Sequence, residues 1–268
     1  MKDPDQARTA LITGASTGIG RELAFLFARD GFDLVLVSRN RGTLEKLVAQ
    51  LPPPQGKQHR TIAMDLSVPG EAERLYRATE AEGVRIDVLV NNAGYGAYGA
   101  FHEVSLKNTM NMVELNVNAL TALTWLFLEP MLGRHYGRIM NVASVAAISP
   151  GPYMAAYFAT KAYVLSLTEA LAFELKGTGV AVSALCPGPT KTEFHNRASH
   201  VGSRQYLGGS YHSMSAVKVA KIGYRALMRG KAVCMPGVPN KIAANLGRFF
   251  PRSFVRAAVG AYIKRRMM

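Results

Sequence analysis

The chain has 268 residues, of which 49% are hydrophobic and 19% are charged, as is typical of a globular protein with one sizeable core. No apolar run approaches the roughly 18 residues of a membrane-spanning helix, and the first residues lack the apolar core of a secretory signal. The two cysteines, Cys186 and Cys234, have no metal-binding spacing. We therefore expect a cytoplasmic protein without a metal site.

The net charge of +14 is concentrated in one part of the sequence. Residues 194–268 contain 14 of the 32 Lys and Arg residues and none of the 18 acidic residues. Charge asymmetry of this kind can indicate an anionic partner.

Short apolar segments alternate with helical ones, which is typical of a parallel sheet covered by helices on both faces. Strands are predicted at 9–13, 33–37, 61–64, 86–90, 138–142, 181–185 and 232–235. Helices are predicted at 19–30, 43–51, 106–131 and 154–176. The pattern favours one α/β domain, a doubly wound parallel sheet over residues 1–236, followed by an extension at 237–268.

A glycine-rich turn separates the first predicted strand from the first predicted helix. Its sequence is Thr13-Gly14-Ala15-Ser16-Thr17-Gly18-Ile19-Gly20. The glycines allow a sharp turn and let a phosphate approach the backbone, while the helix start offers free N–H donors. Strand, turn and helix together predict a dinucleotide-binding site.

The end of the second predicted strand selects between the two nicotinamide cofactors, because it reaches the adenosine ribose. The sequence there is Val37-Ser38-Arg39-Asn40-Arg41, without the acid that would bind a free 2′-hydroxyl. Arg39 can pair with a 2′-phosphate, so the sequence favours NADP(H) over NAD, although Arg39 could also be a solvated loop residue. Asp65, in Met64-Asp65-Leu66, is either an adenine contact or a turn cap.

Further motifs follow in order: Asn91-Asn92-Ala93-Gly94, Asn116, Ser144, Tyr157-Phe158-Ala159-Thr160-Lys161 and Pro187-Gly188. With the glycine turn, they make residues 9–194 closely resemble the classical short-chain dehydrogenase/reductase (SDR) family of single-domain Rossmann-type enzymes. The resemblance implies an NADP(H)-dependent oxidoreductase that interconverts a carbonyl and a secondary alcohol. It also implies a homodimer or homotetramer that associates through the two longest helices.

The resemblance assigns catalytic roles to Asn116, Ser144, Tyr157 and Lys161. In this family the tyrosine exchanges a proton with the substrate oxygen, although the pKa of a free phenol, about 10, is too high for efficient catalysis near neutrality. Lys161 lies four residues on, on the same helical face, and its ammonium favours the phenolate. Ser144 is expected to orient the substrate oxygen, and Asn116 to anchor a water chain that reaches Lys161.

The same family pattern places several residues along the nicotinamide part of the cofactor. They are Asn92, Ala93, Gly94, Tyr157, Lys161, Pro187, Gly188 and Thr192. Thr192 has an alternative role as a helix N-cap.

The family's substrate lid corresponds to residues 194–215, whose glycines and polar residues suit a mobile loop. The opposite wall is expected to contain Tyr95, Tyr98, Tyr153 and Met154, whereas Phe158 is expected to be a core residue. Such a wall suits an apolar or aromatic ketone or alcohol.

The C-terminal residues contain an apolar stripe at helical spacing, flanked by Lys and Arg. Its members are Phe254, Val255, Ala258, Val259, Tyr262 and Ile263. A basic amphipathic helix of this kind can lie on an anionic membrane, contact another subunit or dock on its own domain. The basic segment could also attract an anionic substrate such as a coenzyme A thioester, whereas no nucleic-acid-binding module is recognisable.

Two alternative functions share these motifs. A reductase of 3-oxoacyl thioesters would have all of them. A non-catalytic NADP-binding sensor protein is a poorer match, because such proteins usually lose the tyrosine or the lysine.

Overall fold

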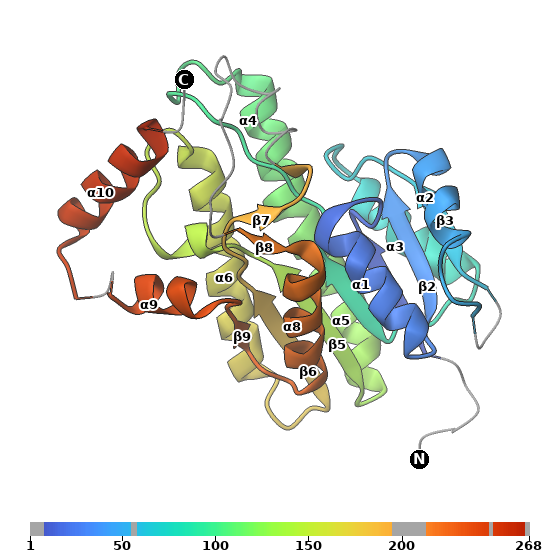
Figure 1. Cartoon of the computed structure of the whole chain (residues 1–268). Coiled ribbons are helices and arrows are strands. Elements are labelled where there is room, and N and C mark those ends of the chain that lie inside the picture. The colour runs from blue at the N-terminus through green and yellow to red at the C-terminus, as the bar shows by residue number, and fades with distance from the viewer. Residues whose placement is uncertain (1–7, 55–57, 195–212, 247–248, 266–268) are drawn as a thin grey trace.

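A fully parallel sheet of seven strands forms the centre of the computed structural model, which describes residues 8–54, 58–194, 213–246 and 249–265. The strands are β1 (Thr9–Thr13), β2 (Asp33–Ser38), β3 (Arg60–Ala63), β4 (Val88–Asn91), β5 (Gly137–Val142), β6 (Val180–Leu185) and β9 (Val233–Cys234). Their order across the sheet is β3-β2-β1-β4-β5-β6-β9 (Figure 1). All seven predicted strands are confirmed, with ends that differ from the prediction by at most two residues.

The sequences of the central strands explain why they lie inside. Ala10, Leu11 and Ile12 of β1 are completely buried, as are Leu34 to Leu36 of β2. Parallel strands are covered on both faces, so they require continuous apolar runs rather than alternation. The order reverses between β1 and β4, and in such sheets ligands bind beyond the carboxyl ends of the strands at this point.

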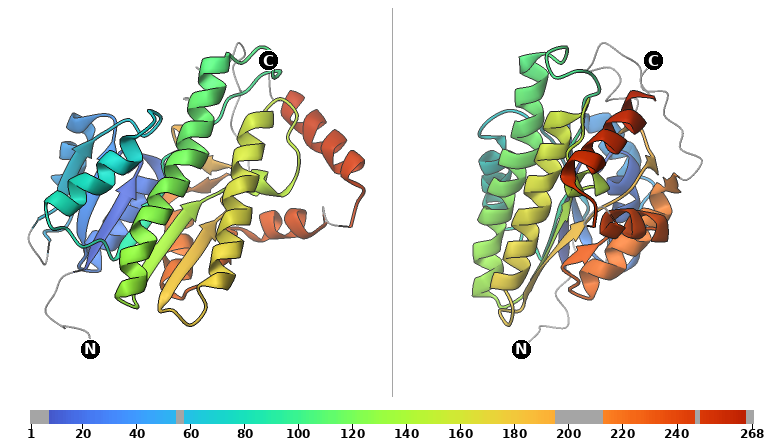
Figure 2. Two further views of the ribbon diagram at one scale, coloured as in Figure 1. Left: turned by 180° about the vertical axis from the view of Figure 1, so that it is seen from behind. Right: turned by 90° about the vertical axis from the view of Figure 1, so that its left-hand side faces the viewer.

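Helices cover both faces of the sheet (Figure 2). One face packs against α1 (Gly18–Arg29), α2 (Arg41–Val48) and α8 (Ala216–Met228). The other packs against α3 (Glu71–Ala81), α5 (Leu120–Gly133) and α6 (Ala155–Glu174). Three further helices lie towards the carboxyl ends of the strands: α4 (Leu106–Val113), α9 (Val238–Leu246) and α10 (Arg252–Lys264). A short parallel pair, β7 (Thr190–Lys191) and β8 (Met214–Ser215), lies beside them. The fold is therefore the predicted Rossmann-type α/β architecture.

The helix predicted over 106–131 is present as one continuous helical segment over residues 106–133, but it is not a regular α-helix throughout. The chain forms α4, then a π-helical segment over Glu114–Ala119, then α5. The wider turn contains Asn116, whose side-chain amide bonds to the backbone of Tyr95 rather than facing a regular helical neighbour. Single π-helical turns of this kind often occur at functional sites.

Three helices, α3, α8 and α9, were not among the predicted ones. In α3 only Ala72, Leu75 and Thr79 are buried, so its apolar signal is short and lies among charged residues. Over the part of the chain that the structure describes, no helix is long and apolar enough to cross a membrane.

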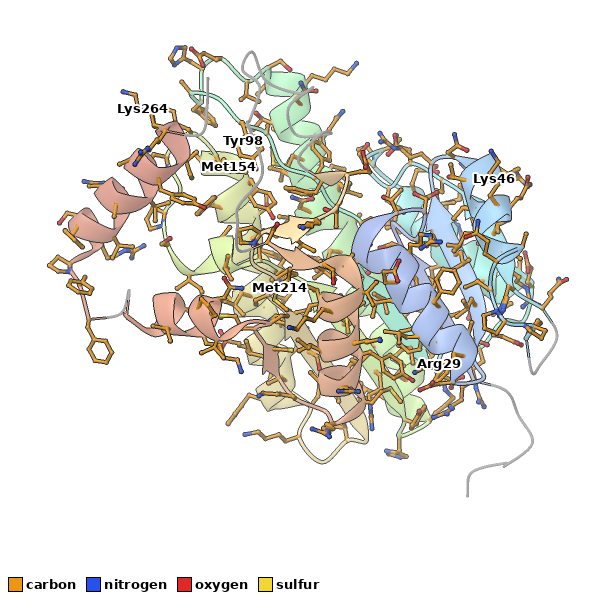
Figure 3. The ribbon with its side chains drawn as sticks, viewed as in Figure 1. Arg29, Lys46, Tyr98, Met154, Met214 and Lys264 are labelled. Carbon is orange, nitrogen blue, oxygen red and sulfur yellow. The ribbon has the colours of Figure 1, made fainter. Side chains whose placement is uncertain are left out.

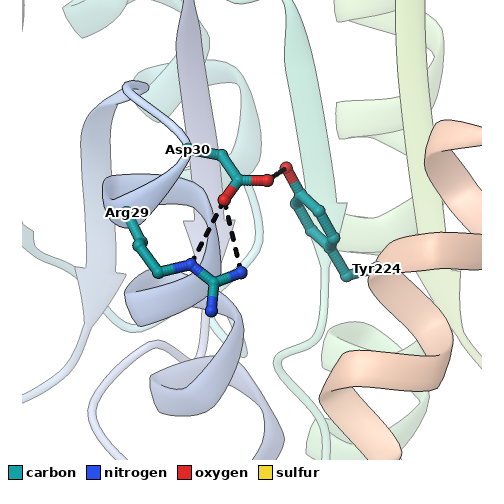
Figure 4. Close-up of polar contacts among 3 residues, drawn as sticks. All are labelled: Arg29, Asp30 and Tyr224. Carbon is teal, nitrogen blue, oxygen red and sulfur yellow. Dashed lines mark hydrogen bonds and ion pairs between the residues drawn. The ribbon is translucent and has the colours of Figure 1, made fainter.

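A hydrogen bond joins α1 to α8 across the surface of the sheet (Figure 4). The Tyr224 hydroxyl donates to Asp30 at 2.7 Å, and Arg29 forms an ion pair with the other carboxylate oxygen at 3.3 Å. The Tyr224 ring packs edge-to-face on Phe27 with 4.8 Å between ring centroids. Because the first helix of the chain and a late one meet here, this contact fixes how α8 lies on the sheet.

We expect Tyr224→Phe to lower the free energy of unfolding by only about 1 kcal/mol, because it removes one hydrogen bond and leaves a carboxylate that water can reach. Tyr224→Ala also removes the buried ring, so it should cost about 3–5 kcal/mol. Urea denaturation of both variants tests this. Equal losses would contradict the view that ring packing dominates the contact.

Candidate active site

The turn after β1 has the geometry of an anion-binding loop. Gly14 and Gly18 have positive φ angles of 63° and 58°, which favour glycine. Thr17, the N-cap of α1, makes no side-chain capping hydrogen bond to any described residue. The first N–H groups of α1 are therefore available to a phosphate.

The side chain of Asn92 is hydrogen-bonded to the backbone of this turn. Its Nδ2 donates to the carbonyl oxygens of Thr13 and Gly14 at 2.9 and 3.1 Å. A Cβ atom on Gly20 would lie 2.5 Å from Asn92 Nδ2, so no larger residue fits there. Gly20 thus lies under the turn rather than in contact with a ligand.

One large cavity, of about 1370 Å³, extends from this turn to the start of α6. Drug-sized ligands typically occupy about 300–1,000 Å³, so there is room here for a dinucleotide and a second molecule. All predicted cofactor residues except Gly20 line it: Gly14, Ser16, Thr17, Gly18, Ile19, Ser38, Arg39, Asp65, Leu66, Asn92, Ala93, Gly94, Tyr157, Lys161, Pro187, Gly188 and Thr192.

Arg39 follows β2 and forms part of the cavity wall at that end. Its side chain is exposed. Asn40 and Thr43 lie beside it and were not predicted. Asn40 is the N-cap of α2 and accepts a hydrogen bond from Thr43 N at 3.0 Å, a capping signal that the sequence does contain. Arg39 therefore projects from a loop whose conformation is fixed on both sides.

Asp65 and Thr192 each make a local capping hydrogen bond, and the ligand contacts expected of them stay predictions. An Asp65 oxygen accepts hydrogen bonds from the backbone and hydroxyl of Ser67 at 3.1 and 2.7 Å, as a turn cap does. Thr192 Oγ1 accepts from Phe194 N at 3.3 Å. Both residues also line the cavity, so capping and ligand contact are compatible here.

Ser144 and Tyr157 converge on the cavity from different elements. Ser144 follows β5, and its Oγ accepts a hydrogen bond from Ala146 N at 3.1 Å. Tyr157 is in the first turn of α6 and is 8% exposed. Burial raises the pKa of Tyr157 to about 12, and a hydrogen bond with the Ser144 side chain lowers it in part.

Lys161 lies one helical turn after Tyr157 and is 4% exposed. Its Nζ donates to the carbonyl oxygen of Val142 at 2.7 Å and lies 6.0 Å from the centroid of the Tyr157 ring. Burial lowers the pKa of Lys161 to about 8. No carboxylate among the described residues forms an ion pair with it.

Asn116 lies behind the cavity rather than on its wall. Its Nδ2 donates to Tyr95 O at 2.9 Å and to Thr160 Oγ1 at 3.1 Å, and its Oδ1 accepts from Tyr95 N at 3.2 Å. A Cβ atom on Gly94 would lie 2.9 Å from Asn116 Oδ1 and 3.4 Å from Lys161 Nζ. Asn116 is therefore close to Lys161 across Gly94, and the water chain between them stays a prediction.

The substrate end of the cavity contains most of the expected wall. Tyr95, Tyr98 and Met154 line it, and Tyr98 and Met154 lie between α4 and α10 (Figure 3). Tyr153 does not line it. Phe158 lines the cavity while its ring also covers Gly151, so it is both a wall and a packing residue.

The C-terminal helices complete this end of the cavity, which the sequence did not reveal. The lining residues from α9, α10 and the segment between them are Asn240, Ala244, Phe250, Arg252, Val255, Val259, Tyr262 and Ile263. The apolar stripe was the signal that could have indicated this contact. Most of the predicted lid, 195–212, lies outside the described residues. Across the described ranges, no group of three or more His, Cys, Asp and Glu side chains is placed to hold a metal ion.

Comparisons with known proteins agree with this geometry. The family model for short chain dehydrogenases matches residues 8–201. The chain is 39% identical over 189 residues to Oxidoreductase UcpA of Escherichia coli (strain K12), covering 69% of this chain and 70% of that protein.

Two solved structures resemble the whole fold. A short-chain dehydrogenase from Sphingobium yanoikuyae in complex with NADPH has a TM-score of 0.79 and 32% identity, covering 90% of this chain and 93% of that one. A short chain dehydrogenase/reductase from Burkholderia phymatum in complex with NAD has a TM-score of 0.77 and 26% identity, covering 92% and 95%. With the family model matching most of its length, the chain belongs to the short-chain dehydrogenase/reductase family of oxidoreductases.

Proposed function

We propose that this protein is an NADP(H)-dependent oxidoreductase that interconverts a carbonyl and a secondary alcohol. One observation carries the proposal: Ser144, Tyr157 and Lys161 share a single cavity with the glycine turn and Arg39. A dinucleotide that lies on the turn can therefore extend to the same atoms that would hold a substrate oxygen.

The residues present fit such a cofactor. The uncapped start of α1 offers N–H donors to a pyrophosphate, and Arg39 offers a guanidinium to a 2′-phosphate. Asp65 is the one acidic residue on the described cavity wall, and it is already engaged with Ser67. When bound, the nicotinamide would donate or accept a hydride.

Side chains of the protein would donate the proton to the substrate oxygen and stabilise the negative charge that develops there. At neutral pH the raised pKa of Tyr157 keeps its hydroxyl protonated, ready to donate to a carbonyl oxygen during reduction. Ser144 would hydrogen-bond the same oxygen and stabilise charge in the transition state. The Lys161 ammonium stabilises the phenolate that donation leaves behind.

The walls indicate what kind of molecule can enter. Apart from Arg252 and a few small polar groups, the substrate end presents aromatic and aliphatic side chains such as Tyr98, Met154 and Val259. Such a surface favours a ketone or alcohol with a bulky apolar body.

We expect Arg39→Ala to weaken NADPH binding about tenfold and to leave NADH binding almost unchanged, because a charge-assisted hydrogen bond to a phosphate contributes about 1.5–3 kcal/mol and this site is exposed. Fluorescence titration with both cofactors measures this.

The matched control is Arg41→Ala, which removes a neighbouring exposed arginine that does not line the cavity. An equal loss of NADPH affinity in both variants would show that overall positive charge, rather than a specific contact of Arg39, strengthens binding. Preference of the unaltered protein for NADH would refute the role of Arg39.

We expect Tyr157→Phe to lower kcat for reduction of an aromatic ketone about 10²–10⁴-fold, because the proton donor is lost while the buried ring is kept. NADPH affinity should stay within a factor of about two, since the phenyl ring still forms the cavity wall. Full activity in this variant would remove Tyr157 from the chemistry.

The pKa of Lys161 predicts how reduction depends on pH. Below pH about 8 the lysine is an ammonium that supports the phenolate, and above it this support is lost, so kcat should fall as pH rises through about 8. Tyr157, with a pKa of about 12, stays protonated across this range and is not the source of the loss. A kcat that stays constant to about pH 10 would contradict this assignment.

A further inference from the structure

Helix α10 has two apolar stripes. Val255, Val259 and Ile263, spaced by four residues, pack towards the cavity, and Ile263 is 5% exposed. The second stripe, Phe254, Ala258 and Tyr262, precedes the first by one position and is exposed. Consecutive residues of a helix are about 100° apart, so the two stripes are adjacent, and the exposed stripe extends the apolar surface beyond the part that packs towards the cavity.

The exposed stripe continues into the segment before the helix. Phe249 is 83% exposed, and Phe250 packs on Phe254 with 5.3 Å between ring centroids. We call Phe249, Phe250, Phe254, Ala258 and Tyr262 the C-terminal apolar surface. Three phenylalanines and a tyrosine exposed in one region of the chain are the kind of apolar surface that usually marks an interaction site.

Several basic residues lie on the same helix, and Arg265 is on the side of the exposed stripe. Arg252, Arg256, Lys264 and Arg265 are all exposed, and none forms an ion pair within the part of the chain that is described. The sequence from residue 194 onwards contains no acidic residue that could neutralise them. The partner must therefore combine negative charge with an apolar layer.

A second copy of the same surface does not meet this requirement. A symmetric contact would bring four basic residues against the same four, and like charges face to face are repulsive. Another face offers copies of the chain an alternative contact, because α5 and α6 lie side by side (Figure 2) and expose Trp125 and Phe173.

We propose that the C-terminal apolar surface docks on an anionic phospholipid bilayer. Aromatic side chains then enter the boundary between headgroups and acyl chains, while the basic residues nearest to them, Lys264 and Arg265, contact the headgroup phosphates. The helix lies on the bilayer and does not cross it, in agreement with its length of 13 residues.

Docking would place the mouth of the cavity at the bilayer. Phe250, Arg252 and Tyr262 both line the cavity and remain exposed, so they form part of its rim. A lipophilic carbonyl compound could then pass from the bilayer into the apolar end of the cavity. This route for the substrate rests on the proposed function, whereas docking itself does not.

Co-sedimentation of the full chain with vesicles tests the proposal. One set of vesicles is phosphatidylcholine alone, and the other contains equal parts of phosphatidylcholine and phosphatidylglycerol. We expect strong binding to the anionic vesicles, weak binding to the neutral ones, and loss of the difference at high salt. Because no cofactor or substrate is present, the result is independent of catalytic activity.

Lys264→Gln combined with Arg265→Gln should weaken binding to anionic vesicles about twenty- to thirtyfold, since each basic residue near such a surface strengthens binding about fivefold. Arg225→Gln combined with Arg229→Gln removes the same charge from exposed positions in α8 and at its C-cap, and should have little effect. Phe249→Gln combined with Phe254→Gln should weaken binding about tenfold or more, whereas Phe173→Gln on α6 should not.

Several outcomes would overturn the proposal. They are absence of vesicle binding, equal binding to both lipids, or an α8 variant as defective as the α10 variant. The remaining alternative is that the surface joins two copies of the chain, and light scattering tests it by measuring the mass in solution. If the Phe249 and Phe254 variant has a smaller mass in solution than the unaltered protein, the surface joins copies of the chain and the bilayer is excluded.

Discussion

The hydroxyl of Thr13 joins two parts of the chain that are 77 residues apart, and the cofactor-facing surface depends on it. This group, in a residue that is 2% exposed, donates to Val90 O at 3.3 Å and accepts from the backbone N–H groups of Asn92 and Ala93, both at 3.0 Å. Strand pairing alone would align β1 with β4 but would leave the loops beyond them independent. With the hydroxyl between them, the glycine turn and the Asn92-Ala93-Gly94 run form one rigid floor for a ligand.

The buried ammonium of Lys161 is the most costly feature of the site. Transfer of a lysine into an apolar interior strongly disfavours its charged form, and the single hydrogen bond to Val142 O offsets only part of this. The fold retains the group next to Tyr157, where its field acts through little water. Perturbed pKa values are common among residues of functional sites, and here they occur at two neighbouring side chains, Tyr157 and Lys161.

A structural feature was predictable from the sequence when it depends on residues that are close together in the chain, and was not when it depends on contacts between distant segments. The strands and the glycine turn were predictable because β1 and its turn follow from neighbouring residues. Asn116 was identified by resemblance, but its π-helical turn was not, since that turn depends on a bond to Tyr95 across the fold. For the same reason the apolar stripe of α10 was visible while its position over the cavity was not. Tyr153 was expected on the wall, but it takes a positive φ of 65° and does not line the cavity.

The order of strands across the sheet also determines how the chain can acquire its structure. Residue 10 in β1 pairs on one side with residue 34 and on the other with residue 88. During synthesis β1 and β2 can associate early, but the other side of β1 stays an open, fully apolar edge until β4 has emerged. Such edges recruit other strands, and non-local parallel pairing is slow. Nascent chains therefore pass through an interval in which the future centre of the sheet is its most aggregation-prone edge, and rapid translation through residues 40–90 would shorten that interval.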